Sequence, residues 1–385
     1  MHISTPAPHH PHSILCVVGA RPNFMKMAPI MAALDNLEPA LKVSLVHTGQ
    51  HYDVTMNHQY FEALGIPQPD INLEVGSGSH AVQTADVMRR FEPALDVTQP
   101  SAVLVVGDVN STLACALVAA KKGIPVIHVE AGLRSFDRAM PEEINRILTD
   151  QISDLLFITE RSGRENLLRE GIADSRIRFV GNVMIDTLRR NLERAVPVNK
   201  ILKDAGKKMS VNGHDYAVLT LHRPSNVDDP NILRTLLETI LKISTRLPVI
   251  FPMHPRTRAM TEKFGLSEML NAPGLVQLPP MGYLEMLGLM KDARVVLTDS
   301  GGIQEETTAL GVPCITLRNN TERPITVDEG TNTIAGQDPV KILAAFDEIM
   351  RSGGKAGRIP EFWDGQASVR IATAIHEWLE NGLRS

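Results

Sequence analysis

The chain has 385 residues, of which 43% are hydrophobic and 22% are charged, and its formal net charge is −5 at pH 7. This length is long for one hydrophobic core and suits two domains, while the apolar content excludes a disordered chain. The negative charge gives no support to nucleic-acid binding, and no apolar run reaches the roughly 18 residues of a membrane span.

The first 13 residues, MHISTPAPHHPHS, contain four histidines but no apolar core. They are therefore expected to form a disordered tail, and neither a secretory signal nor a metal site. The three cysteines, Cys16, Cys115 and Cys314, lie in apolar runs without the spacing of metal ligands. Buried, reduced thiols are expected, which suits a cytoplasmic protein.

Residues 14–181 alternate between short apolar runs and helical patterns. Strands are predicted at 14–18, 43–47, 103–106, 126–129, 155–158 and 177–180, and helices near 24–37, 55–64, 80–98, 110–121, 141–153 and 160–170. Because the strands are apolar throughout, they are typical of a parallel sheet covered by helices on both faces. The sequence therefore predicts an α/β fold whose first doubly wound, Rossmann-like domain spans residues 14–190.

Charged side chains follow these strands at the edge where doubly wound sheets bind their ligands. They are Arg21 and Lys26 after the first strand, Asp108 after the third, and Glu130 and Arg134 after the fourth. One such charge would normally be a cap or a surface residue, but five together predict a functional cleft. The sequence has neither a G-x-G-x-x-G fingerprint after the first strand nor a Walker A lysine loop.

Two glutamates, Glu142 and Glu143, stand in the first turn of the helix predicted to begin at Pro141. Acidic residues in a first turn interact favourably with the positive end of the helix dipole. This structural role would explain either glutamate. Glu142 lies nearer the loop that faces the predicted cleft, so it is the candidate functional residue of the two.

The composition changes between residues 190 and 214, where Lys, Asn, Gly and Asp become frequent and the strand rhythm lapses. A new series of strands is then predicted at 217–221, 249–252, 275–278, 295–297 and 314–317. Histidine and arginine follow the first two, at 222–223 and 254–256, which favours anion binding. We expect a second doubly wound domain over residues 191–365, with a C-terminal helix at 366–385 packing back on the first.

A glycine turn separates the strand that ends near Thr298 from the next predicted helix. Ser300, Gly301 and Gly302 stand at the start of that helix, where free backbone N–H groups and the helix dipole favour a negative charge. The helix is expected from Ile303 to Leu310, with Gly311 and Pro313 ending it. A capped helix without a ligand is the plain alternative to an anion site.

Side chains around the same turn favour the anion site. Glu305 and Glu306 lie one turn into the helix, where a carboxylate could accept hydrogen bonds from sugar hydroxyls. Arg318 and Arg323 follow the next strand, and their guanidinium groups suit phosphate. Ordinary solvated glutamates remain the alternative for the acidic pair.

Seven motifs, in order, carry a resemblance to a known family: G-A-R-P-x-x-x-K, G-D-x-x-S-T, H-V-E-A-G-L-R-S, M-P-E-E-x-N-R, L-H-R-x-x-N-V-D, T-D-S-G-G-I-Q-E-E and T-E-R-P. Together they resemble the non-hydrolysing UDP-N-acetylglucosamine 2-epimerases over residues 14–371. The resemblance implies a glycosyltransferase-B-like fold of two Rossmann-like domains facing a cleft. It also implies a homodimer that interconverts UDP-GlcNAc and UDP-ManNAc for polysaccharide synthesis, with no cofactor, metal, nucleic acid or membrane partner.

The resemblance also assigns site residues by position. The catalytic positions are matched by Asp108, Glu130, Glu142 and His222. The substrate-binding positions are matched by Arg21, Lys26, Ser300, Gly301, Gly302, Glu306 and Arg323, with Glu306 at the ribose position. Gln50 and His51 lie near positions of a regulatory UDP-GlcNAc site in some bacterial members. Which carboxylate removes the C2 proton and which returns it stays open, and His222 is expected at the leaving diphosphate.

The sequence departs from the family pattern at Asn23, where many members have Glu, and at Pro224 and Ser225, where many have Arg and Glu. Met281 and Met286 differ from some relatives near the uracil pocket. A related UDP-2-acetamido or UDP-2,3-diacetamido sugar therefore remains open as substrate.

Three rival functions use the same scaffold: a glycosyltransferase of the same fold, a hydrolysing epimerase and an inactive UDP-sugar sensor. The three acidic positions of the first domain argue against the transferase, which needs only one base there. Hydrolysing epimerases are often fused to a kinase domain; no such domain is expected in this sequence, which argues against the hydrolysing enzyme. The four matched catalytic positions argue against the inactive sensor.

Overall fold

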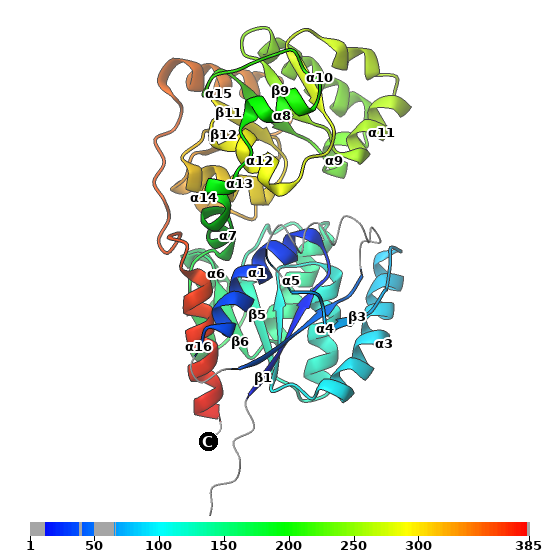
Figure 1. Cartoon of the computed structure of the whole chain (residues 1–385), viewed down its shortest axis with the longest axis vertical. Coiled ribbons are helices and arrows are strands. Elements are labelled where there is room, and N and C mark those ends of the chain that lie inside the picture. The colour runs from blue at the N-terminus through cyan, green and yellow to red at the C-terminus, as the bar shows by residue number, and fades with distance from the viewer. Residues whose placement is uncertain (1–11, 38–40, 50–64, 66, 383–385) are drawn as a thin grey trace, which may run out of the picture. The chain divides into compact units, whose positions relative to one another are not determined.

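The computed structural model of the chain describes residues 12–37, 41–49, 65 and 67–382 (Figure 1). The predictions for a tail before residue 12, for a helix near 55–64 and for Gln50 and His51 lie outside these residues. Ser13, expected in the tail, begins the first strand. The described residues form two compact units: one extends to Thr187 and resumes at Phe362, and the other spans Leu188–Glu361. The sequence pattern placed these two boundaries at 190/191 and 365/366.

The first unit contains a parallel sheet with the strand order β3-β2-β1-β4-β5-β6-β7. Its strands are β1 (Ser13–Val18), β2 (Lys42–His47), β3 (Ile71–Asn72), β4 (Ala102–Val106), β5 (Val126–Ala131), β6 (Leu155–Ile158) and β7 (Ile177–Phe179). Its helices are α1 (Arg21–Asp35), α3 (His80–Thr98), α4 (Asn110–Lys121), α5 (Pro141–Ile152), α6 (Arg161–Arg169) and α16 (Ala367–Gly382), while α7 (Val183–Asn191) leads into the second unit.

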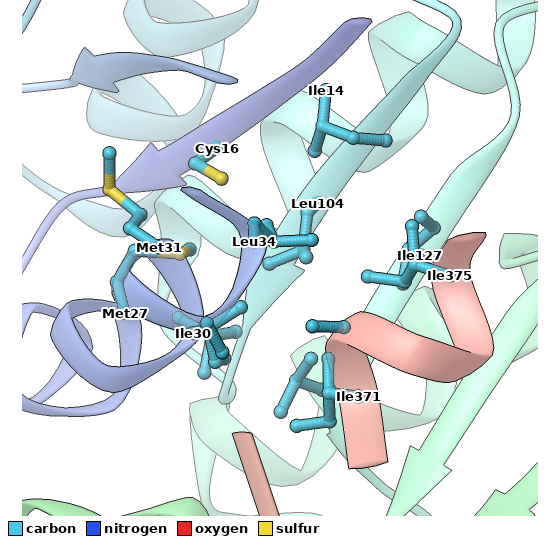
Figure 2. Close-up of a cluster of buried hydrophobic side chains, with 14 of the residues drawn as sticks. Ile14, Cys16, Met27, Ile30, Met31, Leu34, Leu104, Ile127, Ile371 and Ile375 are labelled. Carbon is cyan, nitrogen blue, oxygen red and sulfur yellow. The ribbon is translucent and has the colours of Figure 1, made fainter. Parts of the chain in front are cut away.

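Both faces of this sheet are covered, as the continuous apolar strands predicted. Alternate residues of β1 point to opposite faces: Ile14 and Cys16 belong to one core cluster, and Leu15 and Val17 to another. Helices α1 and α16 supply side chains to the first cluster (Figure 2). Helix α16, the last element of the chain, therefore completes the core of the first unit.

The second unit contains a parallel sheet with the strand order β10-β9-β8-β11-β12-β13. Its strands are β8 (Ala217–Thr220), β9 (Val249–Pro252), β10 (Leu275–Leu278), β11 (Val295–Thr298), β12 (Cys314–Thr316) and β13 (Asn332–Ile334). Its helices are α8 (Val198–Asp204), α9 (Pro224–Val227), α10 (Pro230–Ser244), α11 (Pro255–Lys263), α12 (Tyr283–Lys291), α13 (Gly301–Leu310), α14 (Pro324–Asp328) and α15 (Pro339–Ser352).

The strand order reverses in each sheet where its first strand meets the fourth, between β1 and β4 and between β8 and β11. The predicted class of two doubly wound α/β domains is thus confirmed. The three cysteines are buried, as expected. Among the described helices, none combines the length and apolar content needed to cross a bilayer. Ligands of doubly wound sheets bind beyond the carboxyl ends of the strands at the reversal. The residues that follow these four strands are therefore the first candidates for a ligand-binding site.

Candidate active site

Glu130 stands at an irregularity near the end of β5. The register between β5 and β6 shifts between Val129 and Ala131, and Glu130 has a φ of +74° there. A non-glycine residue in the left-handed region is strained, and such strain persists only where the surrounding structure holds it. The Glu130 side chain is only 4% exposed, and its carboxylate pairs with Lys26 Nζ of α1. The sequence placed both residues in the site, and the structure brings them into contact.

Asp108 follows β4 and is held by α5. Its carboxylate pairs with Arg146 Nη2, and Asn145 Nδ2 donates to its backbone oxygen at 2.9 Å. The preceding Gly107 has a φ of +71°, and a Cβ there would lie 3.2 Å from Lys26 Nζ. Glycine therefore lets the β4–α4 turn form close to the lysine that pairs with Glu130.

The two glutamates at the start of α5 have different surroundings. Glu143 is buried and accepts hydrogen bonds from Ser135 N, Ser135 Oγ and Phe136 N, each at 2.9 Å, and it also pairs with Arg146. It therefore organises the loop before α5 and the arginine that holds Asp108. Glu142 is half-buried.

Asn23, which departs from the family pattern, ties the ends of β1 and β4 together. Its Oδ1 accepts from Ala20 N at 2.9 Å, and its Nδ2 donates to Val106 O at 2.8 Å. The asparagine thus braces the turn from which α1 begins at Arg21. A glutamate could not donate to Val106 O when ionised.

Arg134 does not belong with the other strand-end charges. Its guanidinium is buried, with Nη2 2.8 Å from Asp150 Oδ2 and Nε donating to Glu170 Oε1 at 2.8 Å. The expectation that it lies in the cleft is therefore wrong, because acidic partners on α5 and after α6 hold it inside the first unit.

In the second unit, His222 and Asp299 meet across the reversal between β8 and β11. His222 Nδ1 lies 2.8 Å from Asp299 Oδ1. The same carboxylate accepts from His222 N at 3.0 Å, Arg223 N at 2.9 Å and Asn226 Nδ2 at 3.1 Å. Burial would raise the pKa of Asp299, but the hydrogen bonds and charge interaction with His222 and the backbone donors hold it below its usual value.

This contact fixes the imidazole of His222. An ionised carboxylate only accepts hydrogen bonds, so Nδ1 of His222 carries a proton, and Nε2 is the nitrogen that can serve a ligand. The His222 side chain is 34% exposed, whereas that of Asp299 is 0% exposed. Asp299 was not among the predicted site residues, although it lies inside the quoted T-D-S-G-G motif.

The start of α13 has the features of an anion site. Ser300 is the N-cap residue, its side chain makes no capping hydrogen bond, and its backbone N donates to Thr298 Oγ1 at 3.0 Å. A Cβ on Gly302 would meet nothing within 4 Å, whereas a Cβ on Gly301 would collide with Glu322 Oε1. The space beside Gly302 lets a ligand approach the helix start closely.

Glu306 lies inside the same helix with a side chain that is 4% exposed. Burial raises the pKa of its carboxyl to about 7, and the Tyr283 hydroxyl of α12 acts in the opposite direction. Its Oε1 makes no hydrogen bond to the part of the protein that the structure describes. A buried carboxyl oxygen in this state is suited to a hydroxyl donor supplied by a ligand.

Glu305 does not share this position. Its Oε1 lies 2.6 Å from Arg323 Nε, so the expectation that it accepts from a sugar beside Glu306 is wrong. Arg318 Nη2 lies 2.8 Å from Glu322 Oε2, and all four side chains are buried. Burial would raise the pKa of Glu322, but Arg323 and Arg318 outweigh it and hold that pKa well below its usual value. Two arginines and two glutamates thus neutralise one another.

Comparison with known proteins gives these features a context. The family model described as UDP-N-acetylglucosamine 2-epimerase matches residues 33–376. The UDP-N-acetylglucosamine 2-epimerase of Methanococcus maripaludis is 44% identical over 367 residues, covering 94% of this chain and 98% of the relative. The UDP-2,3-diacetamido-2,3-dideoxy-D-glucuronate 2-epimerase of Pseudomonas aeruginosa is 40% identical over 371 residues, covering 93% and 98%.

A solved structure agrees with these matches. The Methanocaldococcus jannaschii UDP-GlcNAc 2-epimerase, crystallised with UDP-GlcNAc and UDP, superposes with a TM-score of 0.86 at 40% identity and covers 95% of this chain and 99% of its own. Within the described residues, no group of three or more His, Cys, Asp or Glu side chains is arranged to hold a metal ion. The family model, the relatives and the fold lead to one conclusion: this chain belongs to the UDP-N-acetylglucosamine 2-epimerase family.

Proposed function

We propose that the protein is an isomerase that interconverts UDP-N-acetylglucosamine and UDP-N-acetylmannosamine at C2. The observation that carries the proposal is the pair of strand-end carboxylates, Asp108 and Glu130, which form ion pairs with Arg146 and Lys26 respectively. Epimerisation needs acid and base groups at fixed positions, and these ion pairs fix both groups within the first unit. The relatives that bear this name support the choice of substrate.

The chemistry follows from the substrate. C2 of an N-acetylhexosamine has no neighbouring carbonyl, so its proton is not acidic. If the C1–O bond breaks, its electron pair leaves with UDP and positive charge develops at C1. Loss of the C2 proton to a carboxylate then forms the C1–C2 double bond of 2-acetamidoglucal. Return of a proton to the opposite face and re-addition of UDP give the epimer, with no net oxidation or reduction.

The carboxylates of the first unit are proposed to move the C2 proton. Asp108, Glu130 and Glu142 supply one group that removes it and another that returns it. The strained backbone of Glu130 supports this role, because such strain concentrates at functional sites. Lys26 and Arg21 are proposed to bind the substrate beside them.

The second unit is proposed to bind the UDP group that leaves and returns. His222 is proposed to face the diphosphate through Nε2, with Asp299 holding its Nδ1. The N–H groups of Ser300, Gly301 and Gly302 add positive potential there, and Arg323 is proposed to contact the diphosphate. Glu306 accepts from the ribose hydroxyls, which its buried, unbonded Oε1 supports.

A proton NMR time course with UDP-GlcNAc tests the proposal. We expect UDP-ManNAc to accumulate until an equilibrium mixture is reached, without added cofactor or sugar acceptor. Unchanged UDP-GlcNAc would contradict the proposal and favour a glycosyltransferase, which needs an acceptor. Free ManNAc would indicate a hydrolysing epimerase instead.

The Asp108→Asn variant links the proposal to a residue. We expect kcat to fall by at least about 100-fold, because Asn cannot take up a proton, while UDP-GlcNAc binding stays close to that of the unchanged protein. Calorimetric titration and the NMR assay measure the two quantities. Turnover close to normal would remove Asp108 from the catalytic set.

A second candidate substrate is a UDP-2,3-diacetamido uronic acid, because a relative named for that activity is 40% identical over nearly the whole chain. Running both sugars in the same NMR assay separates the two candidates by kcat/KM. A larger value for the uronic acid would make UDP-GlcNAc the minor substrate.

The family resemblance also bears on the oligomeric state and the location of the enzyme. On its strength we propose a homodimer in the cytoplasm, with no nucleic-acid partner. Light scattering coupled to size-exclusion chromatography measures the mass in solution, and a mass near that of one chain would contradict the dimer. Cell fractionation tests the location.

A further inference from the structure

His128 lies near the middle of β5, two residues before Glu130, and its side chain is 0% exposed. Both of its ring nitrogens make hydrogen bonds inside the first unit. Nδ1 lies 2.7 Å from Asp150 Oδ1 of α5, and Nε2 lies 2.9 Å from the carbonyl oxygen of Gly107. The ring therefore joins α5 to the end of β4, immediately before Asp108.

The hydrogen-bond partners of the ring indicate which of its nitrogens carry a proton. A carbonyl oxygen can only accept a hydrogen bond, so Nε2 donates to Gly107. Asp150 Oδ2 accepts from Gly132 N at 3.1 Å and lies 2.8 Å from Arg134 Nη2, an arrangement that stabilises the ionised carboxylate. An ionised Asp150 also only accepts, so Nδ1 donates as well. A neutral imidazole has one N–H and would leave one nitrogen lone pair facing an oxygen.

We infer that His128 is an imidazolium in the folded protein at neutral pH and that it is a positioning residue for Asp108 and Glu130. The part concerning Asp108 and Glu130 rests on the proposed function, and the protonation of the ring does not. Donation from Nε2 fixes the peptide that joins Gly107 to Asp108. The bonds to Asp150 from His128 Nδ1 and Gly132 N hold the chain on both sides of Glu130.

The hydrogen bonds to Asp150 explain how Glu130 keeps its conformation. A residue with a φ of +74° reverts to an ordinary conformation unless its neighbours are held in place. One carboxylate, that of Asp150, holds the residue two places before Glu130 and the residue two places after it. The strain at Glu130 is thus balanced by buried, charge-assisted hydrogen bonds.

The charges around the ring compensate its protonation. The chain of contacts runs from His128 to Asp150, from Asp150 to Arg134, and from Arg134 to Glu170, which places two cations and two carboxylates in alternation. The residues paired with His128 on the neighbouring strands, Val105 and Leu156, are uncharged. A buried cation is tolerated where such partners compensate it.

Imidazole nitrogen chemical shifts test the protonation directly. In the intact protein with 15N-labelled histidine, we expect both ring nitrogens of His128 to show imidazolium shifts and both ring protons to be observed from pH 6.5 to 8. The His128→Gln variant assigns the signals. If that variant does not fold, nuclear Overhauser contacts from the ring protons to the Val105 and Leu156 methyl groups assign them instead. A lone-pair nitrogen shift at either ring position at pH 7 would overturn the inference, whatever the enzyme does with UDP-sugars.

Kinetics test the positioning role. The substrate is the UDP-sugar that the unchanged protein turns over. With it, we expect kcat of His128→Gln to fall by about 10- to 100-fold and KM to stay within threefold. The reason is that the catalytic groups move, whereas the UDP-binding residues of the second unit do not. The matched control is His376→Gln, a half-buried histidine of α16, which should keep kcat. A folded His128→Gln enzyme with a kcat within twofold of normal would overturn the positioning role. A failure of the proposed function would show instead as no turnover by the unchanged protein.

Discussion

Asp299 holds His222 through one side-chain contact while accepting three further hydrogen bonds at 0% exposure. The buried carboxylate therefore sets both the turn after β8 and the orientation of the ring. His222 and His128 each bond an aspartate through Nδ1. They differ in their surroundings. Nε2 of His128 forms a hydrogen bond with a carbonyl oxygen, whereas the side chain of His222 is partly exposed.

The Asp299→Asn variant should lose kcat by about 100-fold, because an amide nitrogen facing Nδ1 would favour the wrong tautomer of His222. Folding should weaken by roughly 2 kcal/mol, since charged acceptors make the stronger hydrogen bonds. Steady-state kinetics and denaturant unfolding measure both effects. The matched control is Asp228→Asn, which breaks a surface pair with Arg256 and should change neither quantity much. An unchanged kcat in Asp299→Asn would show that His222 needs no orienting partner.

Glu306 should make substrate binding depend on pH. Burial raises its pKa to about 7, so it is mostly protonated at pH 6 and mostly ionised at pH 8. Ribose hydroxyls donate better to the ionised form. UDP-GlcNAc should therefore bind about tenfold more weakly at pH 6 than at pH 8, as the ionised fraction dictates. Calorimetry of the unchanged protein and of Glu306→Gln measures this, and the same pH dependence in both proteins would exclude Glu306 as its source.

The sequence predicted which segments contribute to the candidate site better than it predicted which side chains can reach a ligand. Arg134 and Glu305 have the right residue types and positions, but Asp150, Glu170 and Arg323 bind them inside the fold. Such partners come from other elements, so no local pattern indicates them. Asp299 was missed for the same reason, because its role depends on His222, which lies 77 positions away in the chain.

Helix α13 begins at Gly301, two positions before the predicted start at Ile303. Glycine has a low helix propensity, so the pattern favoured the later start. The structure holds the first turn through the hydrogen bond from Ser300 N to Thr298 Oγ1. The two glycines at the start then have different surroundings, one against Glu322 and one beside open space.

Alanine at these two glycines should have opposite effects on stability. Gly302→Ala should stabilise the fold by up to about 1 kcal/mol, since alanine favours helix and the added Cβ meets no atom. It should also weaken UDP binding, because the methyl group occupies the approach to the helix start. Gly301→Ala should destabilise by about 1–3 kcal/mol, because Glu322 cannot retreat without disturbing its pair with Arg318. Denaturant unfolding and calorimetry measure these quantities, and equal stability of the two variants would contradict this account of the turn.

Strands with an apolar run of their own were predicted well, and the shortest edge strands were not. The bounds of β6, β9 and β10 match the predicted 155–158, 249–252 and 275–278. The strands β3 and β13, with two and three residues, were missed. A strand this short has no apolar run of its own, and it forms because the neighbouring strand offers free backbone groups.

Each unit contains a parallel sheet that reverses its strand order, and its candidate residues follow strands at or next to the reversal. The sequence supported this arrangement because continuous apolar strands require cover on both faces. The sequence could not predict how buried polar groups near the candidate site pair, such as Asp150 with His128 and Gly132. These contacts depend on packing between helices and strand ends.

The central claim is that C2 loses its hydrogen as a proton and regains one from a carboxylate that exchanges with solvent. The most direct measurement is proton NMR of the epimerisation in deuterated water. We expect UDP-ManNAc to carry deuterium at C2 from the first turnovers. UDP-ManNAc that keeps the original C2 hydrogen would contradict elimination and the roles given to Asp108, Glu130 and Glu142.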